Sequence, residues 1–172
     1  TFPGLPIRGQ WVRLANTLGE LEARRSYPAA VRGLVGEMLA STALIADGIK
    51  WGGSVVLQFR GNGPLHTVMA ECRHRHLLRG IGRWREPEET ALSEELVPFR
   101  TLLGEAQLAI TLVPDLAKNP DAKPYQGLIG IEEPTLASNL MRYFEASEQL
   151  PTRLYFERTR DQLTGLLLQR LP

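Results

Sequence analysis

The sequence predicts an α+β domain in which antiparallel sheets pack against helices, and two patterns support this prediction. Residues 28–48 place apolar side chains at helical spacing. Residues 52–84 instead alternate apolar and polar positions in three segments joined by short turns, which is typical of an antiparallel meander. Because the strands come in groups and do not alternate one by one with helices, the pattern indicates α+β and not α/β.

The length of the chain fits one domain. Its 172 residues are enough to bury a substantial apolar core without disulfides or metals. No repeat, low-complexity segment or interdomain linker divides the sequence. We therefore expect a single compact core domain over residues 1–172.

The first elements are read from local signals. Residues 10–14 (Gln-Trp-Val-Arg-Leu) predict a short strand, and residues 17–20 (Thr-Leu-Gly-Glu) have the spacing of a capping box that begins a short helix. Pro28 suits the first turn of a second helix, since its missing N–H costs nothing there, and Gly48 is a suitable end. The apolar stripe of this second helix comprises Val31, Leu34, Val35, Met38, Leu39, Thr42 and Ile45.

The meander follows directly. From Gly52 the period changes to two, and Val55, Leu57 and Phe59 share one face of the first strand. The turn Gly61-Asn62-Gly63-Pro64 leads into a second strand. The predicted second and third strands cover residues 65–71 and 77–84, with a polar turn at 73–75.

The second half of the chain adds strands and two helical regions. Residues 92–103 predict a helix that Pro98 interrupts. Residues 114–124 form a polar loop flanked by prolines. Residues 135–149 predict a helix whose apolar face carries Leu136, Leu140, Tyr143 and Phe144. The remaining strands are expected at residues 108–112, 125–131, 152–159 and 163–171.

Charge and composition exclude several classes of function. Twenty basic residues balance nineteen acidic ones, which argues against bulk electrostatic binding to nucleic acid or to an anionic membrane. The sequence contains no run of roughly 18 apolar residues, so we expect no membrane-spanning helix. The start of the chain lacks the features of a signal peptide and is not Met, so we expect a fragment. The single cysteine fits a reducing, cytoplasmic location.

Three histidines and the cysteine are the candidates for metal binding. His74 and His76 share a strand face, with His66 and Cys72 nearby. Zinc needs about four converging ligands, or three with water. We therefore prefer to interpret these four residues as exposed turn and strand residues, and not as a metal site. Arg73 and Arg75 near Cys72 favour a reactive thiol, but no second cysteine exists to form a disulfide with it, so an inert thiol is preferred.

A basic cluster provides the alternative function. Five arginines between Arg73 and Arg85 lie near Trp84, as in a nucleic-acid-binding α+β domain. Acidic residues follow at once, which favours a solvated sheet face. No nucleophile elbow, phosphate loop or converging carboxylate pair is visible, so an enzyme would need an unrecognised site in a concave pocket. The arginines of this cluster are Arg73, Arg75, Arg79, Arg83 and Arg85.

An ordered set of motifs resembles a known family. The stretches, in family order, are Arg8-Gly9, Gln58-Phe59-Arg60-Gly61-Asn62-Gly63-Pro64-Leu65, Arg79-Gly80, Tyr125-Gln126-Gly127-Leu128-Ile129-Gly130 and Tyr143-Phe144-Glu145-Ala146-Ser147-Glu148-Gln149-Leu150-Pro151-Thr152-Arg153. Together they span nearly the whole chain. They resemble the redox-regulated holdase family of thirty-three-kilodalton heat-shock chaperonins.

The resemblance implies an ATP-independent, cytoplasmic chaperone that binds unfolding client proteins, and not an enzyme. Family members carry four cysteines beyond this domain that hold zinc when reduced, and the chain reaches Pro172 before any of them. Zinc and redox sensing are therefore not carried over to residues of this chain, and we expect no cofactor in it. The resemblance and the number of apolar strand faces suggest a homodimer.

A covering linker in the resembled family implies that the core domain has an apolar face for clients. The alternation of the last two strands leaves one face of each outside the core. Candidate client-binding residues on these strands are Tyr155, Leu166, Leu167 and Leu168.

Overall fold

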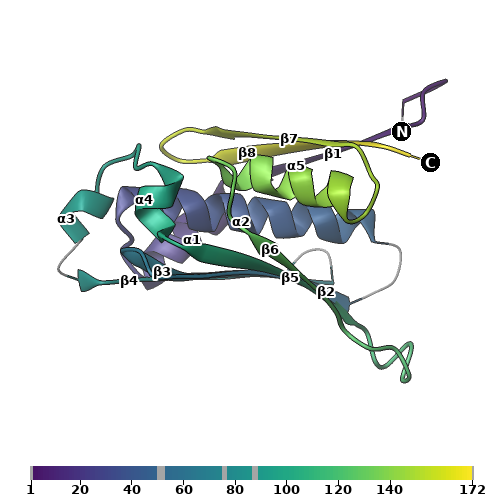
Figure 1. The fold of residues 1–172 in the computed structure, drawn as a ribbon, viewed down its shortest axis with the longest axis horizontal. Helices are drawn as coiled ribbons and strands as arrows, with labels where there is room; N and C mark the ends of the chain where they lie inside the picture. Colours follow the sequence, from purple (N-terminus) through teal and green to yellow (C-terminus); the bar gives the residue numbers. More distant parts are fainter. Residues whose placement is uncertain (1, 50–52, 75–76, 87–88, 172) are drawn as a thin grey trace.

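Two antiparallel sheets enclose a layer of helices in the computed structural model, which describes residues 2–49, 53–74, 77–86 and 89–171 (Figure 1). This arrangement confirms the predicted α+β class. The smaller sheet has the order β1-β8-β7, and the larger has the order β4-β3-β2-β5-β6. The strands are β1 (Ile7–Leu14), β2 (Gly53–Gly61), β3 (Leu65–Arg73), β4 (Leu77–Trp84), β5 (Ala106–Pro114), β6 (Tyr125–Gly130), β7 (Thr152–Arg158) and β8 (Leu163–Arg170).

The central helix α2 (Ala29–Gly48) forms most of the layer between the sheets, and α5 (Leu136–Ala146) lies beside it (Figure 1). Val31, Val35 and Met38 are fully buried, because α2 has a sheet on both sides. Pro28 is the N-cap residue of α2, one position before the first turn in which it was predicted, and its carbonyl accepts the Arg32 N–H at 2.9 Å. The remaining helices are short: α1 (Asn16–Arg24), α3 (Glu89–Leu92) and α4 (Phe99–Leu103).

Helix α2 is long and apolar enough to cross a membrane by composition alone. However, 72% of its apolar window is buried inside the fold. A core helix of a globular domain passes the same test, and here both sheets cover it. The apolar character of α2 is therefore explained by its central position.

Helix beginnings show one error in the predictions. No side chain caps α1, which has Ala15 at its N-cap, so the predicted capping box at residues 17–20 is wrong. A reciprocal box occurs instead at α5, where Thr135 Oγ1 accepts the Ser138 N–H at 3.1 Å and Ser138 Oγ accepts the Thr135 N–H at 3.2 Å. A serine stands where the usual box has Glu or Gln, so the spacing alone did not reveal it.

The meander prediction is confirmed, and its first turn is held in place by residues far away in the sequence. Strands β2, β3 and β4 are neighbours in the larger sheet. The turn between β2 and β3 packs against the loop that follows α4: Gly63 N–H donates to Leu103 O at 2.9 Å, and Asn62 Oδ1 accepts the Glu105 N–H at 2.8 Å. Backbone therefore lies against backbone here, and a side chain at Gly63 has no room.

Replacing Gly63 with alanine is expected to lower the free energy of unfolding by about 1–3 kcal/mol through overpacking. A Cβ at this position would lie 2.5 Å from Gly104 N and 2.8 Å from Leu102 O, and neither backbone atom can move alone. Urea unfolding measures the change. Gly19→Ala in α1 is the control, because a Cβ there meets nothing within 4 Å and should stabilise the helix. Equal stability of the two variants would contradict the prediction.

Candidate functional site

The outward face of the smaller sheet carries a row of apolar side chains across all three strands. Trp11 pairs with Leu166, and Leu166 pairs with Tyr155, so the three side chains are neighbours on one face. Trp11 is 65% exposed and Tyr155 is 55% exposed, while Leu166 between them is half-buried. No described helix or strand covers this row in Figure 1, where α2 and α5 lie against the opposite face of the sheet.

Leu168 and Phe2 extend this row along the sheet. Gly9 pairs with Leu168, and a Cβ on Gly9 would lie 3.1 Å from the Phe2 ring and 3.3 Å from Leu168 Cδ2. The absence of a side chain at Gly9 therefore lets Phe2 and Leu168 pack over the strand backbone. Phe2 remains 46% exposed. We call the set Phe2, Trp11, Tyr155, Leu166 and Leu168 the apolar face.

Charged side chains border the apolar face. Arg13, Glu157 and Arg153 are exposed on the same side of the smaller sheet, in the cross-strand rows next to Trp11 and Tyr155. Contiguous exposed apolar surface with a polar rim is typical of sites that bind other proteins. The charged rim also keeps the edges of this sheet solvated.

The structure separates the four candidate residues of the last two strands. Tyr155, Leu166 and Leu168 lie on the apolar face. Leu167 points the other way, is 2% exposed and belongs to the core, which corrects its inclusion among the candidates. The sequence did not reveal Trp11, because strand alternation alone does not show that Gln10 is buried while its aromatic neighbour is exposed.

The basic cluster is partly neutralised. Glu71, which is 5% exposed, accepts the Arg73 Nε–H and the Arg79 Nη2–H, each at 2.6 Å. Arg85 donates to the Asn62 carbonyl at 3.2 Å, and Arg75 lies outside the described residues. A buried carboxylate thus interrupts the positive face, which weakens the nucleic-acid alternative.

The histidines and the cysteine do not converge. His66 Nδ1 lies 3.0 Å from Thr67 Oγ1, His74 is exposed in a turn, and His76 is not among the described residues. Within residues 2–49, 53–74, 77–86 and 89–171, no three His, Cys, Asp or Glu side chains are grouped to hold a metal ion. Cys72 is fully buried between Ala46 and Val55.

Burial, followed by the Glu71 carboxylate, raises the pKa of the Cys72 thiol to about 11. The thiolate is the reactive species, so we expect iodoacetamide to label native Cys72 only as fast as the fold opens, even at pH 8. Mass spectrometry over time measures the labelling. Protein unfolded in urea at about 8 M is the control, because Cys72 is then fully accessible. Labelling of the native protein as fast as of the unfolded chain would contradict this prediction.

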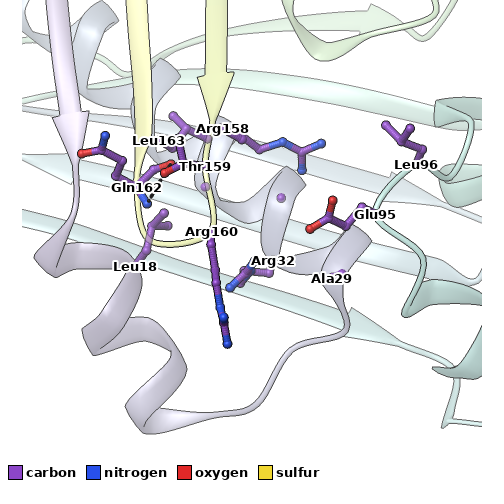
Figure 2. A pocket seen from close by; sticks show the side chains of 12 residues that line it. Leu18, Ala29, Arg32, Glu95, Leu96, Arg158, Thr159, Arg160, Gln162 and Leu163 are labelled. Atoms are coloured by element: carbon purple, nitrogen blue, oxygen red, sulfur yellow. Dashed lines mark hydrogen bonds between the residues drawn. The ribbon is translucent and has the colours of Figure 1, made fainter.

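A pocket of about 360 Å³ opens between α2, the β7–β8 hairpin and the loop before α4. Figure 2 shows Arg32, Arg158, Arg160 and Glu95 around it. Two of these arginines already have carboxylate partners: Arg32 lies 2.8 Å from Glu22 and Arg158 lies 3.7 Å from Glu37.

The chemistry of this pocket is that of a structural contact. Burial raises the pKa of Glu37, and the Arg158 charge opposes that shift. Thr159, which carries a hydroxyl into the lining, accepts the Gln162 N–H at 3.3 Å within its own turn. Among the described lining residues, no nucleophile is paired with a base.

Comparison with known proteins identifies the family. Residues 1–172 match the family model described as Hsp33 protein. The chain belongs to the Hsp33 family. The 33 kDa chaperonin of Shewanella denitrificans is 37% identical over 171 residues, and the 33 kDa chaperonin of Vibrio cholerae is 36% identical over 175 residues. Each alignment covers 99% of this chain but only 56% and 57% of the two relatives.

A solved structure supports the fold. The crystal structure of the Hsp33 homologue from Thermotoga maritima matches with a TM-score of 0.74 at 19% identity. The match covers 96% of this chain and 57% of that one. The predicted α+β fold and the predicted Hsp33 resemblance are thus both confirmed. The chain spans little more than half the length of its Hsp33 relatives, which are named chaperonins.

Proposed function

We propose that this chain is the client-binding domain of an Hsp33 holdase, which binds unfolding proteins without ATP and prevents their aggregation. The apolar face is the observation that supports the proposal. Unfolding proteins expose apolar segments of varied sequence, and a sheet face with three exposed aromatic rings offers contact area without demanding one shape.

Regulation is expected to require chain beyond this domain. With Cys72 as its single cysteine, and buried, this chain offers no thiol pair for a disulfide switch. We propose that the domain binds clients constitutively under reducing conditions, holds no zinc and acts in the cytoplasm. Elemental analysis after dialysis tests the zinc proposal, and stoichiometric zinc would contradict it.

The direct test is light scattering of a heat-denaturing model protein with this chain added in equimolar amount, in reducing buffer without ATP. Suppressed scattering and binding of a hydrophobic dye are expected. If a folded chain, verified by circular dichroism, shows neither effect, the holdase proposal is wrong. The same assay with single-stranded DNA as competitor addresses the alternative function, since displacement of clients by DNA would favour the basic cluster.

We also propose that the chain forms a homodimer, because apolar strand faces remain exposed on both sheets. Leu77 and Leu128, on the outward face of the larger sheet, are 65% and 64% exposed. Sedimentation velocity at micromolar concentration tests this proposal. A single monomeric species would contradict it.

A further inference from the structure

An open pocket of about 570 Å³ lies on the outward face of the larger sheet, on the side away from α2 (Figure 1). Its side chains come from β2, β3 and β4, beside the turn that joins β2 to β3. Cationic and neutral polar groups surround two apolar side chains there. The residues that give the pocket its chemistry are Arg60, His66, Thr67, Met69, Ile81 and Arg83.

The strand register brings the two arginines to the same pocket. Arg60 pairs with Thr67, and Thr67 pairs with Arg83, so the three residues form one cross-strand row. Neighbouring strands lie about 4.8 Å apart, which places the two arginine backbones about 10 Å apart on either side of Thr67. Arginine side chains are long enough for both to reach one anionic group above Thr67.

A β-bulge adds a histidine beside this row. The register between β3 and β4 shifts between Leu65 and Thr67, so His66 is the additional residue of the bulge. Consecutive strand residues normally face opposite sides of a sheet. Here His66 and Thr67 both line the pocket, and His66 Nδ1 lies 3.0 Å from Thr67 Oγ1. The bulge therefore places two hydrogen-bonding side chains on the same side as the arginines.

The positive charge of the pocket is not neutralised within the described part of the chain. Arg60 and Arg83 are exposed, and no described carboxylate forms an ion pair with either of them. None of the described lining residues is acidic. The neighbouring Arg73 and Arg79 differ in this respect, since both are bound to Glu71. Two guanidinium groups, which suit carboxylate and phosphate oxygens, are thus left for a ligand.

The surroundings of the arginines favour a carboxylate on a polypeptide over the phosphates of a nucleic acid. Met69 and Ile81 are cross-strand partners in the next row, and both are half-buried, so they offer apolar contact beside the charges. Single-stranded nucleic acid binds through aromatic rings on which its bases stack. No described lining residue is Phe, Tyr or Trp, and the Trp84 ring packs on Tyr27 against the core instead.

We propose that this pocket binds an acidic segment of a polypeptide. One carboxylate of the segment bridges Arg60 and Arg83 above Thr67, and an adjacent apolar side chain packs on Met69 and Ile81. The inference rests on the proposed function in one respect, since the polypeptide that the domain meets is an unfolding client. It gives client recognition a charge-selective contact on the larger sheet, separate from the apolar face.

The test titrates acetyl-Leu-Glu-Leu-Glu-amide into the whole chain and follows the Met69 methyl group and the Thr67 amide by NMR. Saturable shifts at both positions are expected. Raising the salt concentration from about 50 mM to about 500 mM should weaken binding, because salt screens exposed charges. Acetyl-Leu-Gln-Leu-Gln-amide has the same size without the charges, and it should bind at least about fivefold more weakly. Equal binding of the two peptides would overturn the inference.

A double variant tests whether the two arginines make the selective contact. Arg60→Gln with Arg83→Gln should raise the dissociation constant of the acidic peptide at least about fivefold and abolish the preference for it over the neutral peptide. Both positions are exposed, so the fold should persist, and circular dichroism verifies this. Arg24→Gln with Arg170→Gln, at exposed positions outside the pocket, removes the same charge and should bind normally. An equal loss in this control would assign the effect to net charge and overturn the inference.

Single-stranded DNA is the competitor that addresses the other class of ligand. If a thymidine oligonucleotide shifts the same signals at lower concentration than the acidic peptide does, the pocket is a nucleic-acid site and the inference is overturned.

Peptide binding is measured without a client, so the inference and the function on which it rests can fail separately. If the chain suppresses aggregation but does not bind the acidic peptide, the pocket inference fails and the holdase proposal stands. If the peptide binds in the pocket and aggregation is not suppressed, the holdase proposal fails and the pocket remains a site for acidic segments.

Discussion

The double substitution Trp11→Ser and Tyr155→Ser is expected to abolish most suppression of client aggregation. These rings are the most exposed parts of the apolar face, at 65% and 55%. Burying a large apolar side chain contributes about 1.5–3 kcal/mol, so losing both contacts should weaken client binding by at least about a hundredfold. Light scattering and dye fluorescence measure the loss.

Stability should be nearly unchanged in this variant, because substitutions at exposed positions usually alter the free energy of unfolding by less than about 0.5 kcal/mol each. The matched control is Leu77→Ser with Leu128→Ser on the larger sheet, where the exposures are 65% and 64%. A greater loss of activity in the control would assign client binding to the larger sheet instead.

Replacing Leu39 or Leu140 with alanine is expected to lower the free energy of unfolding by about 2–5 kcal/mol. Leu39 is 1% exposed in α2, and Leu140 is fully buried in α5. Leu39 packs against β4 at Gly80, where a Cβ would lie 3.1 Å from Leu39 Cδ2, so the surrounding backbone has little freedom to close the cavity.

Chemical denaturation measures both losses. Leu116→Ala serves as the control, because Leu116 is 55% exposed in the loop after β5. Losses below about 0.5 kcal/mol at both helix positions would mean that the two stripes do not support the core.

Local patterns predicted most elements but not their assembly. The apolar stripe of α2, the β2–β3–β4 meander and the break at Pro98 each follow from neighbouring residues. The division into two sheets does not, because β1 pairs with β8 from the opposite end of the chain. The local pattern of apolar residues does not show that a strand pairs with another strand so far away in the sequence. The first strand also begins at Ile7, three residues before its predicted start.

The candidate site was predicted only where its residues obey alternation. Tyr155, Leu166 and Leu168 could be named from β7 and β8, although the core-facing Leu167 could not be told apart from them. On β1 the usual distribution is reversed: Gln10 is buried beside other polar side chains and Trp11 is exposed. Hydropathy predicts burial of single residues, and it fails where polar groups are buried together.

The contact between the β2–β3 turn and the loop after α4 also constrains the order of folding. The hairpin is local, but its turn is tied by Asn62 to Glu105, 43 residues later. The edge of β2 that does not pair with β3 forms its backbone hydrogen bonds only when β5 is in place. Contacts between residues so far apart in the sequence form late, because closing the loop between them costs conformational entropy. Folding is therefore slower. The amides of Asn62 and Gly63 should therefore exchange with solvent together with the β2–β5 ladder, as one cooperative unit, and not with the hairpin that contains them.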